Sequence, residues 1–301
     1  MHPLKLVLPF VVTLVACGSK VPSVPLPAAS EFPPAGQPAK IVVGTPGTAP
    51  VALRFKAEKG ARDVAAMKMD LTVAAKAGGE SMDMSMGMSS DLEVTVDDVR
   101  ADGSFVLKSV SSKTQLTLGG QLGKMAAGQE STIAEAVNGQ VTTVTQDAQG
   151  RALALEMPAE NPLMKQMAGG LDSAMKGSAV MFPDAPVGVG ATWQALAFVD
   201  LMGGKVRMVS DYKLVELSGR KGKVELTMRG AVGAGESMGL PNGGGTINAL
   251  SFTGNGNITF DLDRPSASAA QIDMKVDADI RAQGQDATMS MSMKLGMAPK
   301  G

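Results

Sequence analysis

Apolar and polar residues alternate with a period of two along most of this chain, and no other feature constrains the fold as strongly. The alternation recurs from residue 51 to residue 297, and turn residues such as Ala101-Asp102-Gly103, Asn138-Gly139 and Ser218-Gly219 separate the runs. Successive side chains of a strand point to opposite faces, so this period predicts strands with one buried and one solvated face. The most regular runs are 67–73, 91–97, 224–229, 258–263, 272–280 and 289–297.

Two segments break the alternation and predict helices. Residues 159–176 carry Leu163, Met167 and Leu171 at helical spacing after the start signal Asn161-Pro162, and residues 122–136 carry a weaker pattern of the same kind. Strands that follow one another through tight turns favour antiparallel pairing. We therefore expect an α+β fold in which a large curved antiparallel β-sheet, half-barrel-like in shape, carries one or two packing helices.

The first residues have the profile of an export signal. Lys5 precedes an apolar run over residues 6–16, which is shorter than the roughly 20 residues that a membrane-spanning helix needs. The run ends at Leu14-Val15-Ala16-Cys17, which resembles the lipobox of bacterial lipoproteins. The resemblance implies that residues 1–16 are removed as a signal peptide and that Cys17 carries the lipid anchor. The expected partner is then a membrane, and Gly18 in place of Asp favours the outer membrane of the cell envelope.

The segment after Cys17 predicts a tether. Residues 17–50 are rich in proline, alanine, serine and glycine and hold few large apolar residues, so they are poorly suited to forming a core. Such a tether spans between roughly 30 Å as a flexible coil and roughly 100 Å as extended polyproline. We expect a single β-rich domain over residues 51–298.

Composition excludes several classes of function. Cys17 is the only cysteine and His2 the only histidine, and His2 lies in the segment expected to be removed. The mature chain therefore lacks imidazole bases, thiol nucleophiles, disulfides and Cys/His zinc sites. We expect no enzyme activity, no catalytic residues and no cofactor. A formal net charge of -1 and an aromatic content of 3% also argue against a nucleic-acid partner.

A segment in the middle of the chain carries a second resemblance. Residues 182–193 include Pro186-Val187-Gly188-Val189-Gly190-Ala191-Thr192-Trp193. This stretch resembles a segment of a family of uncharacterised bacterial outer-membrane lipoproteins, in which a strand containing the Trp opens the second half of a β-rich domain. The expected architecture also resembles the half-barrel lipoprotein carriers, which cradle acyl chains on a concave sheet. That likeness assigns no residue a role.

Two short motifs suggest chemistry but fit other interpretations better. Gly235-Glu236-Ser237-Met238-Gly239 matches the nucleophile elbow of α/β-hydrolases, but it lies in a Gly-rich loop and has no histidine partner. Asp273, Asp277 and Asp279 are spaced like calcium ligands, but they alternate with Lys275 and Arg281 and lack the EF-hand spacing. We interpret them as the solvated face of a strand.

Methionine is the unusual residue of this chain, with 22 copies against 8 of phenylalanine. Three interpretations are open: a core that uses a flexible residue to fill gaps, an adaptable pocket for a lipid or another apolar ligand, and a thioether site for Cu(I) or Ag(I). Alternate residues of a strand lie about 6.7 Å apart, so chelation within one segment requires 78–90 to be a mobile loop. The candidate ligand-binding residues are Met67, Met69, Met82, Met84, Met86, Met88, Met289, Met291 and Met293, and the alternative metal ligands are Met82, Met84, Met86 and Met88.

Taken together, the sequence predicts an anchored lipoprotein of the cell envelope. Its expected role is structural or the binding of a hydrophobic ligand such as a lipid. The alternative is periplasmic binding of Cu(I) or Ag(I) by the same methionines.

Overall fold

The computed structural model describes residues 21–35, 37–156, 180–201, 204–232, 238–239, 245–282 and 285–300. Three elements of the sequence analysis lie outside these ranges. They are the signal segment with Cys17, the predicted helix over 159–176, and Ser237.

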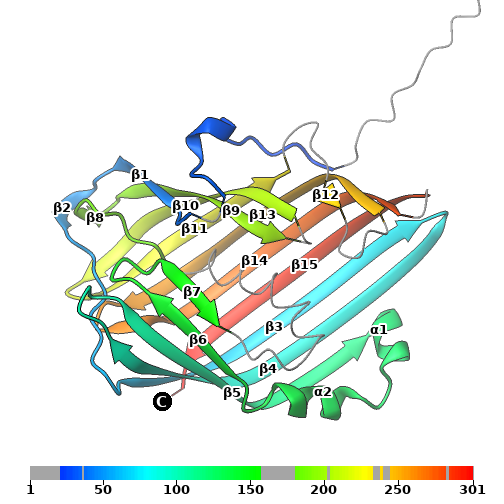
Figure 1. Cartoon of the computed structure of the whole chain (residues 1–301), viewed down its shortest axis with the longest axis horizontal. Helices are drawn as coiled ribbons and strands as arrows, with labels where there is room; N and C mark the ends of the chain where they lie inside the picture. Colours follow the sequence, from blue (N-terminus) through cyan, green and yellow to red (C-terminus); the bar gives the residue numbers. More distant parts are fainter. Residues whose placement is uncertain are drawn as a thin grey trace, which may run out of the picture.

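One 13-stranded antiparallel sheet forms the body of the protein (Figure 1). Its strand order is β1-β9-β10-β11-β13-β14-β15-β3-β4-β5-β6-β7, and the short β12 (Met238–Gly239) pairs with β13. The N-terminal strands are β1 (Lys40–Thr45), β3 (Arg62–Ala77), β4 (Glu80–Val99), β5 (Phe105–Gly119), β6 (Val141–Gln146) and β7 (Ala152–Glu156). The C-terminal strands are β9 (Thr192–Leu201), β10 (Gly204–Ser218), β11 (Lys221–Ala231), β13 (Gly245–Asp261), β14 (Arg264–Ala282) and β15 (Gln285–Pro299).

The sheet consists of two meanders joined by the last strand. Strands β3 to β7 follow one another in sequence and in space, and β9 to β15 do the same. β15 lies between β14 and β3, so that Met293 is opposite Met274 on one side and opposite Leu71 on the other. Tight turns close the hairpins. Gly78 and Gly79 between β3 and β4 have φ values of 56° and 89°, the left-handed backbone that a two-residue hairpin loop requires.

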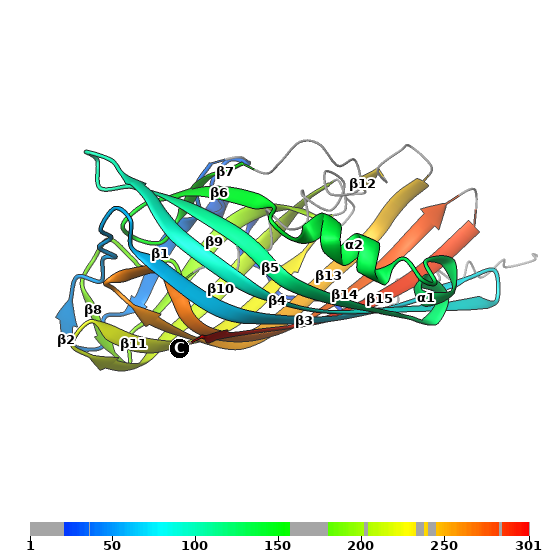
Figure 2. The same ribbon diagram turned by 90° about the horizontal axis from the view of Figure 1, so that it is seen from below.

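The sheet is strongly curved. Figures 1 and 2 show the two edges of the sheet, β1 with β9 and β6 with β7, turned over the same side of the central strands. Side chains from both edges, such as Val144 of β6 and Trp193 of β9, belong to one buried cluster. That shared side is therefore the inner face. The predicted fold, a large half-barrel-like antiparallel sheet with few helices, is confirmed.

The described helices lie beside the end of β5. They are α1 (Gly120–Met125) and α2 (Glu130–Val137), where the sequence predicted the weaker helix over 122–136. β6 pairs with β5 only over Phe105–Val110, and beyond that point the Asn138 side chain after α2 accepts a hydrogen bond from the Thr114 amide at 2.9 Å. Within the described part of the chain, no helix is long and apolar enough to cross a membrane.

The sheet begins earlier in the chain than the sequence predicted. β1 pairs with β9, and β2 (Thr48–Val51) pairs with β8 (Val187–Val189) in a separate two-stranded sheet. Before them, a short 3-10 helix, Ala29–Glu31, leads to Phe32, which is only 7% exposed. The prediction that the tether extends to residue 50 is therefore wrong. The isolated apolar residues of this segment pack against strands formed by later parts of the chain.

Candidate functional site

The strand alternation separates an apolar inner face from a polar outer face. In β11, Val224, Leu226 and Met228 are at most 2% exposed and lie on the inner face. Glu225 and Thr227, between them, lie on the outer face, where Glu225 is opposite Lys213 of β10. Residues directly opposite one another across an antiparallel pair share a face. The register therefore assigns each side chain of the sheet to one of the two faces.

This register brings all the candidate methionines onto the inner face of neighbouring strands. Met82, Met84, Met86 and Met88 of β4 face Ala75, Val73, Leu71 and Met69 of β3. The same β3 residues face Met289, Met291, Met293 and Leu295 of β15 on their other side. Met67 of β3 lies opposite Met297 of β15. Across β14, β15, β3 and β4, four successive rows contain only apolar residues: Ile272-Leu295-Met69-Met88, Met274-Met293-Leu71-Met86, Val276-Met291-Val73-Met84 and Ala278-Met289-Ala75-Met82.

The most deeply buried residues of these rows lie on β14. Val276 and Ala278 of β14 are 1% exposed, whereas the methionines of β15 and β3 and three of those on β4, Met84, Met86 and Met88, are half-buried, and Met82 of β4 is 42% exposed. We call this region, formed by the four rows above near the Gly78–Gly79 turn, the methionine face. It is continuous with the core, because Met289 and Met291 pack against the buried cluster.

The opposite end of the inner face, near the β6–β7 turn, is closed by aromatic packing. Trp193 is 1% exposed, stacks on Tyr212 with ring centroids 5.4 Å apart, and donates a hydrogen bond from Nε1 to the Met181 carbonyl at 2.7 Å. Phe182 meets Phe260 edge-to-face at 4.9 Å. The strand expected around Trp193 is thus confirmed as β9, the first strand of the second meander.

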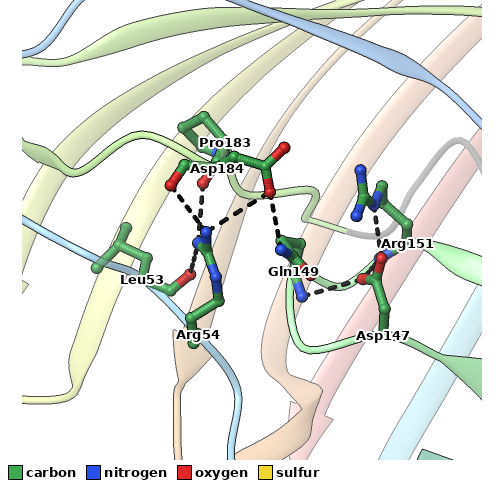
Figure 3. A network of polar contacts seen from close by, with 7 residues as sticks. All are labelled: Leu53, Arg54, Asp147, Gln149, Arg151, Pro183 and Asp184. Carbon is green, nitrogen blue, oxygen red and sulfur yellow. Dashed lines mark hydrogen bonds and ion pairs between the residues drawn. The ribbon is translucent and has the colours of Figure 1, made fainter. Parts of the chain in front are cut away.

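A polar network fastens this closed end (Figure 3). The Arg54 guanidinium donates hydrogen bonds to the carbonyls of Leu53, Pro183 and Asp184 at 2.7, 2.9 and 2.8 Å. The Asp184 carboxylate accepts a hydrogen bond from Gln149 at 2.8 Å. Three segments that are distant in sequence are thereby held together, and they position Phe182 inside the sheet.

The acidic residues of β14 lie on the outer face, as the sequence predicted. Asp273 is opposite Lys294, and Asp277 accepts a hydrogen bond from Ser290 at 2.8 Å and lies 2.9 Å from Lys275. Among the described residues, no group of three or more His, Cys, Asp or Glu side chains is arranged to hold a metal ion.

The condition for a thioether site within residues 78–90 is not met. This segment is the β3–β4 turn followed by strand β4, which pairs with β3 throughout and with β5 from Ser85 onward. The extended backbone keeps Met82, Met84, Met86 and Met88 about 6.7 Å apart. Residues 78–90 are therefore a tight turn and a paired strand, and not the mobile loop that chelation within one segment requires.

The titratable groups with shifted pKa values lie in the core or in structural hydrogen bonds. Burial raises the pKa of the Tyr212 phenol in the core. A hydrogen bond from Lys300 lowers the pKa of Asp91, and hydrogen bonds from Ser104 lower that of Asp102 in the β4–β5 turn. Asp91 is opposite Ala66 and Ser112 on the outer face, so neither carboxylate belongs to the methionine face.

The register reveals contributors that the sequence analysis did not count. Met274 and Met297 lie beside the candidate methionines, although they were seen only as members of alternating runs. Recognising them requires knowing that β15 pairs with both β14 and β3, and alternation within one strand carries no such information.

No protein-family model matches this chain, and no curated protein matches its sequence. Among solved structures, one described as lipid–protein interactions in lipovitellin is similar, with a TM-score of 0.43, 11% identity and coverage of 81% of this chain. This chain spans only 25% of that lipovitellin chain. An outer membrane channel from Pseudomonas putida F1 is similar with a TM-score of 0.20 and 10% identity, covering 85% of this chain and 100% of the channel. Likenesses this remote are not evidence for a shared function.

Proposed function

We propose that this protein is an anchored lipoprotein of the cell envelope that binds an acyl chain of a lipid on its methionine face and catalyses no reaction. The observation that carries the proposal is the set of four uninterrupted apolar rows across β14, β15, β3 and β4, which remain partly exposed beside a tightly packed core.

The difference in burial favours a ligand over an ordinary core. Protein interiors are close-packed, and core side chains are normally shielded from water. Val276 meets this expectation at 1% exposed, but Met82 at 42% does not, although both lie on the same face. A contiguous apolar area that stays accessible to water is typical of a binding surface.

The dimensions of the methionine face suit an acyl chain. From Met69 to Ala75 the strand extends roughly 20 Å, and four strands span roughly 14 Å across. One leaflet of a bilayer has an acyl layer of about 15 Å, half of the hydrocarbon core. Methionine side chains are unbranched and flexible, so a surface made of them can adapt to a chain that is itself flexible.

The energy of such binding is adequate. Each methylene removed from water contributes about 0.8 kcal/mol, so about ten buried methylenes contribute roughly 8 kcal/mol, which corresponds to micromolar affinity. Ordering the ligand and the methionine side chains offsets part of this gain.

Anchoring is the second part of the proposal. The lipobox-like Leu14-Val15-Ala16-Cys17 supports attachment through a lipid on Cys17, and Gly18 supports the outer membrane as the location. Two or more acyl chains on one residue bind a membrane firmly, whereas one chain binds it only marginally.

The proposal is tested by identifying lipids that copurify with the anchorless protein, residues 18–301, prepared without detergent. Mass spectrometry of an organic extract should detect bound phospholipid or fatty acid. The amount should fall sharply in Met291→Asp, because a carboxylate would then be buried against the acyl chain. It should persist in Ser292→Asp, which places the same charge on the outer face of the same strand. Equal amounts in the two variants, or no lipid in the parent, would contradict the proposal.

A further inference from the structure

The N-terminal segment is docked on the outer face of the sheet instead of hanging free. Phe32 packs with Leu196 of β9 and Val209 of β10, and its ring lies 5.7 Å from that of Phe198. Leu26 packs against the same cluster. Leu196 and Val209 are directly opposite one another, one position along each strand from inner-face residues, so this small cluster lies on the outer face.

A polar contact fixes the segment further toward the N-terminus. The Arg229 side chain of β11 donates a hydrogen bond from Nε to the Pro25 carbonyl at 3.1 Å. Arg229 is itself held by an ion pair with Asp211, whose carboxylate also accepts a hydrogen bond from Gln194 at 2.6 Å. We call residues 25–32, held by these contacts, the docked strap.

The strap leads toward the end of the sheet at which the methionine face opens. β1 begins at Lys40, opposite Leu196, and the chain before it runs toward the end of the strands near Gly78–Gly79 (Figure 1). A row of directly opposed residues crosses the sheet at this level. It runs from Arg229 of β11 through Thr253 of β13, Lys275 of β14, Ser292 of β15 and Thr72 of β3 to Ser85 of β4. Pro25 therefore lies level with the row that contains Met291 and Met84.

Only a short length of chain separates the strap from the anchor. Cys17 precedes Pro25 by eight residues, which span at most about 28 Å when fully extended. This maximum is well below the roughly 100 Å that a free tether over residues 17–50 spans as extended polyproline. The body of the protein is accordingly held close to the surface that carries the lipid.

Two of the exposed large apolar side chains lie at this same end. Met82, near the start of β4, is 42% exposed, and Met125, at the end of α1, is 73% exposed. Gly120 at the start of α1 bridges to Met84, so α1 adjoins the methionine face, and Lys124 follows in its last turn. Apolar residues beside a cation suit the boundary between headgroups and acyl chains.

We propose that the docked strap orients the protein so that the open end of the methionine face, with Met82 and Met125 at its rim, meets the lipid bilayer that carries the anchor. This inference rests on the proposed function, and it specifies the partner surface: the bilayer is the source of the acyl chain. In this orientation a lipid passes from bilayer to sheet without crossing water.

The test uses the full lipidated protein, reconstituted into vesicles of phosphatidylethanolamine and phosphatidylglycerol that contain brominated acyl chains. A fluorophore sensitive to bromine quenching is attached at Ser81→Cys, an exposed position near the open end, or at Lys59→Cys, whose side chain is 71% exposed at the closed end. Cys17 is acylated and does not react. Quenching should be several-fold greater at position 81 than at position 59.

Releasing the strap should abolish this difference. Phe32→Asp, or Leu26→Asp as an independent variant, removes the packing on the outer face and should make the quenching at the two positions nearly equal. Equal quenching in the parent protein, or a difference that survives both variants, would overturn the proposed orientation. Failure of the anchorless protein to bind lipid while the quenching difference persists would overturn the proposed function and leave the orientation standing.

Discussion

Met69 of β3 lies directly opposite Met88 of β4 on the inner face of the sheet. Opposed Cβ atoms in an antiparallel pair are about 5 Å apart, so the two thioethers are neighbours, although the residues are separated by a hairpin. Met274 and Met293 form a second such pair across β14 and β15. The face therefore presents thioether sulfur and flexible methylene groups together.

The first prediction separates these two properties. Replacing Met82, Met84, Met86 and Met88 with Leu keeps the volume and apolarity of the face but removes the thioethers. We expect the affinity for a fatty acid to stay within about threefold of the parent, since volume-conserving apolar changes are well tolerated. The measurement is a fluorescence titration of parent and variant, with Cu(I) retention against a competing chelator followed in parallel. A fall of more than tenfold in fatty-acid affinity would contradict this prediction, and Cu(I) that the parent retains and the variant loses would assign the thioethers a metal site in addition.

A second prediction concerns pH. Tyr212 is the only tyrosine, and burial raises the pKa of its phenol above the unfolded value of about 10. Below that pH the group is protonated in both states and has no effect on stability. Above it, the unfolded chain loses the proton that the folded chain retains. The free energy of unfolding should therefore fall by about 1.4 kcal/mol per pH unit from this group.

The absence of other tyrosines makes this prediction easy to measure. The near-ultraviolet absorbance of phenolate should stay flat in the folded protein through pH 10 and appear only with unfolding. In Tyr212→Phe, the contribution of this group to the pH dependence should vanish, while that of the lysines remains. Reversible ionisation of Tyr212 in the folded protein near pH 10 would be inconsistent with its burial.

The third prediction addresses the closed end. Arg54→Ala removes the donor for the carbonyls of Pro183 and Asp184, and leaving the acceptor of the buried Pro183 unsatisfied costs about 1–3 kcal/mol. The control is Arg62→Ala, which breaks an exposed ion pair with Glu93 and should cost less than about 1 kcal/mol. Urea unfolding followed by circular dichroism measures both. Equal losses of unfolding free energy in the two variants would show that the Arg54 network does not hold Phe182 in place.

A fourth prediction concerns the anchor. Cys17→Ala removes the thiol that would carry the lipid, so the exported protein should leave the membrane fraction or remain unprocessed. Incorporation of labelled palmitate should be lost with it. Continued labelling and membrane fractionation of the variant would refute lipidation at Cys17.

The sequence predicts much of the fold because the relevant signal is local. The alternation in 67–73 or 289–297 identifies a strand and its buried side from a few neighbouring residues. The same reasoning places Asp273 and Asp277 on the outer face. It also identifies 122–136 as helical, where α1 and α2 occur.

The remaining features depend on contacts between distant segments. β1 was missed because Ile41 and Val43 form only a short run between prolines, and their partners on β9 lie about 150 residues away. Phe32 was assigned to a tether for the same reason, since its partners Leu196 and Val209 come from the second meander. Whether 78–90 was loop or strand depended on the pairing of β4 with β3 and β5.

The candidate site was only partly predictable. Each methionine run was visible, but the union of several runs into one face requires β15 to pair with both β14 and β3. β3 and β15 lie near opposite ends of the chain, and no single-strand pattern specifies their register.

Titration of the anchorless protein with a fluorescent fatty acid tests the central claim most directly. We predict saturable binding with micromolar affinity, weakened at least tenfold by Met84→Asp or Met291→Asp, because each buries a carboxylate against the acyl chain. The matched variant Ser292→Asp, on the outer face beside Met291, should bind like the parent. No saturable binding, or equal affinity in Met291→Asp and Ser292→Asp, would contradict a lipid-binding methionine face.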